Sequence, residues 1–85
     1  MRCYIYRSTR KQDAYVFLSA RDNFSVLPPE LAQSLGQLVF AMEIELTPER
    51  RLARESANVV IEHLERAGFH LQPPPPRFEI AIEPS

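Results

Sequence analysis

The chain has 85 residues, of which 45% are hydrophobic and 25% charged. This length suits one domain, and the composition is that of a folded globular protein and excludes a disordered tail. The net charge of −1 argues against a dedicated DNA-binding domain, which is normally strongly basic. The only cysteine, Cys3, excludes an intrachain disulfide and a cysteine-cluster metal site, and it indicates a reducing compartment. We find no signal-peptide or membrane-spanning pattern, so we expect a cytoplasmic protein without membrane contact.

Two short strands are predicted near the N-terminus, over residues 2–7 and 14–19, because both segments are rich in β-favouring residues. The polar residues 8–13 between them predict a hairpin loop. Two prolines open a short helix that we expect over residues 28–35, and Gly36 is placed to end it.

The segment 38–46 predicts a further strand with two different halves. Its first five residues, 38–42, are apolar without alternation, which is typical of a strand covered on both faces. Glu43 and Glu45 then alternate with apolar residues, which indicates a solvated end. We therefore expect this strand to lie in the centre of the sheet.

The main helix is predicted over residues 54–67, with Gly68 as its stop. Val59 falls on the polar side of this helix, as a singly exposed apolar residue, which is common, or as part of a contact surface. A brief strand over residues 69–72 precedes four prolines, and the alternating residues 77–83 predict a terminal edge strand with one buried face. The apolar stripe of the main helix consists of Ala53, Ala57, Val60, Ile61 and Leu64.

Several short motifs occur in a fixed order along residues 1 to about 76. They are Cys3-x-Ile5-Tyr6-Arg7-Ser8, Tyr15 after the basic loop, Asp22-x-Phe24-Ser25 leading to Pro28, Leu35-Gly36, and GFHLQPPPP from Gly68. This ordered set resembles the YcgL domain family of small bacterial proteins.

The resemblance implies a small three-layer α/β/α sandwich with four to five strands and two main helices. We expect one YcgL-like domain over residues 1–85, in which residues 73–85 form a proline-rich segment and, from their own alternation, a terminal edge strand. The family is cytoplasmic and has no established activity, so it assigns no catalytic or binding residue to this chain. The tail from Arg77 departs from the family pattern.

The basic hairpin is the best candidate binding site. Its cationic and hydroxyl side chains are suited to holding phosphate, and tyrosines on the adjoining strands could stack bases. The structural alternative is that a helix covers the tyrosines and that the loop is only solvated. The candidate binding residues are Arg7, Ser8, Arg10, Lys11, Tyr6 and Tyr15.

Two further constellations have weaker support. Cys3 would be a nucleophile if His70 lowered its pKa, but a small cysteine in a strand is more often simply buried. His63, His70 and Glu62 lack the tight repeated spacing of a zinc motif. We therefore expect no catalytic residue, no metal and no cofactor; the two glycines also rule out a glycine-rich nucleotide loop.

Three functions remain open. The leading hypothesis is a non-enzymatic interaction or regulatory module that binds a protein partner. The alternative is binding of RNA or another polyanion through the basic hairpin loop, and the third hypothesis is a thiol-dependent enzyme. The sequence leaves the oligomeric state undetermined.

Overall fold

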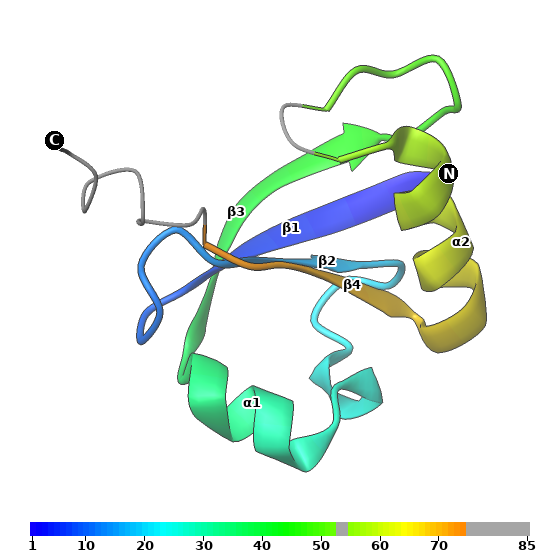
Figure 1. The fold of residues 1–85 in the computed structure, drawn as a ribbon. Helices are drawn as coiled ribbons and strands as arrows, with labels where there is room; N and C mark the ends of the chain where they lie inside the picture. Colours follow the sequence, from blue (N-terminus) through cyan, green and yellow to red (C-terminus); the bar gives the residue numbers. More distant parts are fainter. Residues whose placement is uncertain (53–54, 75–85) are drawn as a thin grey trace, which may run out of the picture.

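The computed structural model describes residues 1–52 and 55–74, which form a four-stranded antiparallel sheet with a helix on each side (Figure 1). This confirms the predicted three-layer α/β sandwich with two main helices. The strand order across the sheet is β3-β1-β2-β4. In chain order the elements are β1 (Arg2–Ser8), β2 (Tyr15–Leu18), the 3-10 helix η1 (Phe24–Val26), α1 (Pro29–Leu35), β3 (Leu38–Glu45), α2 (Ala57–Ala67) and β4 (Phe69–Gln72).

The sheet separates two hydrophobic clusters because successive residues of a strand point to opposite faces. We call the two sides the α1 face and the α2 face, after the helix that packs on each. On the α1 face the buried residues are Tyr6, Ala14, Val16, Leu18, Leu27 and Leu35. On the α2 face they are Cys3, Ile5, Phe17, Ile44, Leu46, Ala57, Val60 and Leu64.

Helix α2 covers only one end of its face. It lies over the end of the sheet where β1 begins, near the N-terminus (Figure 1). At the other end a shallow hollow spans all four strands and is lined by Ile5, Tyr15, Phe17, Met42, Leu52 and Gln72. The prediction that helices cover both faces therefore holds for one face more fully than for the other.

The predicted central position of the strand after α1 is wrong. Strand β3 pairs with β1 on one side only and forms an edge of the described sheet. Its residues from Val39 to Glu43 are exposed, although the first four of them are apolar. The apolar run therefore marks a surface strand instead of a core strand.

The C-terminal end of α2 follows the expected residue type. Gly68 ends the helix in the left-handed conformation, at a φ of 86°, and its N–H donates to the carbonyl of Leu64. The described helix begins at Ala57, later than predicted, and residues 53–54 lie outside the described part. Val59 is 42% exposed, as its position on the polar side predicted.

The predicted terminal strand over residues 77–83 also lies outside the described residues. Over residues 1–52 and 55–74, neither helix has the length and apolar character needed to cross a membrane.

Candidate functional site

The six residues predicted to form one binding site lie on two different sides of the sheet. Tyr6 and Ser8 point to the α1 face, since Tyr6 belongs to the cluster under α1 and Ser8 is bonded to the end of that helix. Arg7 and Tyr15 are cross-strand neighbours in the β1–β2 register and point to the α2 face. The structure therefore brings Arg7 and Tyr15 together and separates them from Tyr6 and Ser8.

Ser8 is a buried structural residue. Its hydroxyl donates to the carbonyl of Leu35 at 2.6 Å and accepts the backbone N–H groups of Arg10 and Lys11 at 3.2 and 2.9 Å. These three bonds fasten the start of the hairpin loop to the end of α1. The Ser8 hydroxyl is thereby fully engaged within the fold.

The next two loop residues are directed at the same helix end. Thr9 donates both its backbone N–H and its hydroxyl to the carbonyl of Gln37, at 3.1 and 2.7 Å. Arg10 donates its backbone N–H to Leu35 and its guanidinium to the carbonyl of Gln33, at 3.3 and 3.1 Å. A cation at this position is favourable because the C-terminus of a helix carries partial negative charge.

Tyr6 is unavailable for stacking on a base because its ring is buried under α1. Its hydroxyl donates to the carboxylate of Asp22 at 2.8 Å and accepts the Asp22 N–H at 2.7 Å. The rings of Phe24 and Phe40 contact it edge-on, at centroid distances of 5.0 and 5.5 Å. Burial is the main reason why the pKa of Tyr6 is raised.

Arg7, Lys11 and Tyr15 are the members of the predicted set that retain solvent access without an internal task. Arg7 and Lys11 are exposed, and Tyr15 is half-buried beside Arg7. We call the adjacent pair Arg7 and Tyr15 the Arg7 patch; Lys11 lies apart from this pair, beside Leu31 and Leu35 of α1.

Cys3 lies in the core and is separated from His70 by β2. Burial raises the pKa of the Cys3 thiol to about 11, so the thiol is protonated at neutral pH. A protonated, buried thiol is a poor nucleophile. The geometry thus fails to support activation of Cys3 by His70 and agrees with the favoured interpretation, a buried cysteine.

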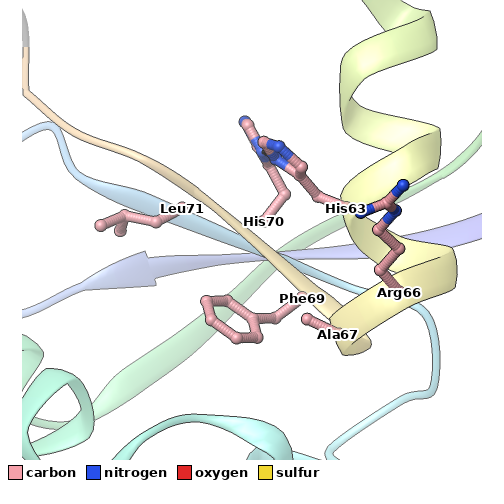
Figure 2. Close-up of a pocket in the computed structure, with 6 residues that line it drawn as sticks. All are labelled: His63, Arg66, Ala67, Phe69, His70 and Leu71. Atoms are coloured by element: carbon pink, nitrogen blue, oxygen red, sulfur yellow. Dashed lines mark hydrogen bonds between the residues drawn. The ribbon is translucent and has the colours of Figure 1, made fainter.

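The structure instead pairs His70 with His63. Their Nδ1 atoms lie 2.7 Å apart, and the rings stack at a centroid distance of 5.0 Å between β4 and α2 (Figure 2). One ring must donate and the other accept, so the pair shares one proton between these atoms. Burial lowers the pKa of His70, while the nearby Glu55 carboxylate opposes that effect.

Glu62, the carboxylate that a metal site at these histidines would need, is engaged elsewhere. Glu62 pairs with Arg66 at 3.3 Å, and the carboxylate near His70 is Glu55, 3.5 Å from its Nε2. Among the residues that the structure describes, no three histidine, cysteine or acidic side chains are placed to hold a metal ion.

Exposed apolar side chains also lie along the edge strand β3, whose residue pattern predicts a core strand. We call this surface the β3 edge and define it by Val39, Phe40 and Met42, which are 37, 38 and 53% exposed. Arg21 places its guanidinium 4.3 Å from the centre of the Phe40 ring. The signal that could have located this surface is the loss of alternation over residues 38–42.

Comparisons with known proteins agree on one family. The family model of the YcgL domain matches residues 3–75. A YcgL domain-containing protein of Thioalkalivibrio sulfidiphilus is 48% identical over 75 residues, which cover 88% of this chain and 93% of the relative. A second, from Xanthomonas oryzae pv. oryzae, is 48% identical over 77 residues, or 91% of this chain and 90% of the relative.

The chain belongs to the YcgL domain family. The names of these relatives give the domain and state no activity. The match to the YcgL domain includes the β3 edge, the Arg7 patch and the histidine pair, and it leaves residues 76–85 outside.

Proposed function

We propose that this YcgL domain is a protein-binding module that accepts an extended segment of its partner along the β3 edge. The observation that carries the proposal is the position of β3 at the edge of the sheet with three large apolar side chains exposed. Proteins recognise extended segments in this way by adding them to a sheet as a further strand.

The backbone of β3 supports strand addition. Backbone bonds at the two ends of the β1–β3 pairing show which residues of β3 direct their backbone N–H and C=O groups toward β1. At one end the Thr9 N–H donates to the Gln37 carbonyl, and at the other the Leu46 N–H donates to the Met1 carbonyl. In an antiparallel ladder such bonded positions alternate with positions that face away. The register shifts by one residue at Ala41, so the alternation is counted separately on each side of it. The residues whose backbone groups point away from β1 are then Leu38, Phe40, Glu43 and Glu45.

The side chains also support this proposal. Natural sheets usually protect an edge with charges, prolines or a covering loop, because an exposed apolar edge invites pairing. Here Val39, Phe40 and Met42 are exposed along one strand, and no described residue pairs with its outer side. An extended apolar segment would bury these side chains and satisfy the outward backbone groups together.

Site-specific photo-cross-linking in the native host tests the proposal. We would place p-benzoylphenylalanine at Phe40 or Met42 and, as the control, at Val59, which is comparably exposed on α2. The expected result is one discrete cross-linked product from both β3 positions and its absence from position 59. In the purified pair, Met42→Lys should then weaken binding by at least about tenfold, since it places a charge in a desolvated contact.

The same diffuse products from all three positions would contradict the proposal. So would a discrete partner whose affinity is unchanged by Met42→Lys.

A second candidate function is polyanion binding through the Arg7 patch. It is favoured by the adjacent, solvent-accessible Arg7 and Tyr15 and by the exposed Lys11. Binding of a mixed RNA pool should then weaken steeply with salt and fall when Arg7 and Lys11 are replaced by alanine. Binding that is undetectable at low salt would exclude this function. In either case we expect the domain to act in the cytoplasm, since its fold has a single cysteine and needs no disulfide.

A further inference from the structure

We infer that the partner strand at the β3 edge is β3 of a second copy of this chain, paired antiparallel about a two-fold axis between Ala41 and Met42. This inference rests on the proposed function and names the partner. It depends on an irregularity in β3 and on the charges beside it.

The irregularity is a β-bulge at Ala41. Tyr6 pairs with Phe40 and Ile5 with Met42, so β3 has one residue more than β1 at this point. Phe40 lies on the α1 face opposite Tyr6, and Glu43 lies on the same face opposite Tyr4. Residues three apart across the bulge therefore share a face, which a regular strand does not allow.

Because of this bulge, β3 can pair with β3 of a second copy along its full length. Directly opposite residues in an antiparallel pair lie on the same face, and a two-fold axis relates each pair to its mirror pair. In a regular strand of eight residues, two residues related by the midpoint point to opposite faces, so they cannot lie opposite each other in a symmetric pair. In β3 the extra residue at the bulge puts the two residues of each such pair on the same face. The resulting pairs are Leu38 with the partner's Glu45, Val39 with the partner's Ile44, Phe40 with the partner's Glu43, and Ala41 with the partner's Met42.

The backbone fits the same register. Phe40 and Glu43 are among the residues whose backbone groups point away from β1. In this register they face each other and exchange N–H···O=C bonds on both sides of the axis. A bulge on an edge strand usually discourages pairing; here it brings the outward groups of the two halves into register.

The charges are complementary in this register. Arg21 lies over the ring of Phe40, so the register places its guanidinium beside the partner's Glu43. Glu43 is also ion-paired with Arg2 of its own chain. The two Glu43 side chains are kept apart, whereas a register centred on Glu43 would oppose them and overlap only residues 41–45 of the strand. The apolar Val39 and Met42 meet apolar residues on the other face.

One pair of edge strands buries less area than a standard protein interface, so the dimer is weak. We expect a monomer at about 10 µM and a substantial dimer fraction near 1 mM, which corresponds to a dissociation constant in the range of about 0.1 to 1 mM. Sedimentation velocity of the full chain over this range measures it directly.

A charge exchange tests the register. Arg21→Glu and Glu43→Arg should each weaken dimerisation by about tenfold, because symmetry places every change at two contacts and turns attraction into repulsion. The double variant Arg21→Glu/Glu43→Arg should recover most of the loss. Met42→Lys should abolish the dimer, and the control Val59→Lys, on α2, should leave it unchanged. Circular dichroism checks that each variant remains folded.

Three results would overturn the inference. The first is a chain that remains monomeric near 1 mM but still cross-links to a different protein from Phe40 and Met42, which would leave the proposed function intact. The second is a dimer that responds equally to Val59→Lys, which would place the contact elsewhere. The third is a monomer whose Phe40 and Glu43 amides are protected from hydrogen exchange until Ile80→Asp is introduced, which would identify the chain's own tail as the occupant.

Discussion

Replacing Ser8 by alanine distinguishes a structural hairpin from a phosphate-binding one. The Ser8 hydroxyl is buried and makes three bonds, to the Leu35 carbonyl and to the N–H groups of Arg10 and Lys11. The Arg10 N–H also reaches the Leu35 carbonyl, so these two groups keep each other as partners in the variant. The Lys11 N–H has no second partner among the described residues.

The expected cost follows from this inventory. Loss of the Ser8–Leu35 bond should cost about 1 kcal/mol, and the unsatisfied Lys11 N–H should cost about 1 kcal/mol more, since it is only partly shielded from water. The free energy of unfolding should therefore fall by about 2 kcal/mol. For a domain of this length, that corresponds to a fall in melting temperature of about 8 to 16 °C.

Thermal and urea unfolding followed by circular dichroism measures this change. Ser25→Ala is the matched control, because among the described residues the Ser25 hydroxyl bonds only to the exposed Asn23 side chain. Its loss should cost less than about 0.5 kcal/mol. The urea midpoint should move without a change in slope. Ser8→Ala with the stability of the control would refute the structural assignment, and loss of RNA binding in such a stable variant would favour the phosphate-binding interpretation.

Three other predictions follow from single residues. Gly36→Ala should destabilise the domain by about 1 to 3 kcal/mol in urea unfolding, because Gly36 has φ 70° and ψ −152° and an added Cβ would lie 3.1 Å from Arg10 Cβ; unchanged stability would contradict this. Burial lowers the pKa of His70 in the folded chain, so the unfolded chain takes up a proton at a higher pH than the folded chain does. The free energy of unfolding should therefore fall as the pH drops below about 6.5, and His70→Gln should flatten that decline. A pH profile that is already flat in the unmodified chain would oppose this reasoning. With a pKa raised to about 11, buried Cys3 should react with iodoacetamide far more slowly in the native chain than in urea, and equal rates would show an accessible thiolate.

Local patterns predicted most of the fold because the relevant interactions are local. β-Favouring residues located β1 and β2, and glycines located the C-terminal ends of α1 and α2. The contact between His63 and His70 was missed because the two histidines meet only when α2 folds back along β4. Spacing along the chain gave no zinc motif and carried no information about a stacked pair.

The error at β3 has a physical cause in the bulge. Continuous apolarity over residues 38–42 predicts a strand that is covered on both faces. In the structure the extra residue at Ala41 resets the alternation, so that Val39 and Met42 share one face and Phe40 and Glu43 the other. A bulged edge strand with apolar contacts on each side of its bulge gives the same residue pattern as a central strand. Only the pairing partner distinguishes the two, and that partner is β1, far away in the chain.

The basic loop shows why residue type alone could not identify a phosphate site. A phosphate group presents oxygen acceptors at negative potential, and so do the last carbonyls of a helix. Cationic and hydroxyl side chains suit both, and Ser8, Thr9 and Arg10 are used for the carbonyls at and beyond the end of α1. A phosphate and the carbonyls at the end of α1 thus compete for the same loop donors, and the carbonyls are nearer because they belong to the fold. Only donors that point away from α1 remain for an external ligand, which is why the Arg7 patch, and not the loop as a whole, is the part of this hairpin to test for polyanion binding.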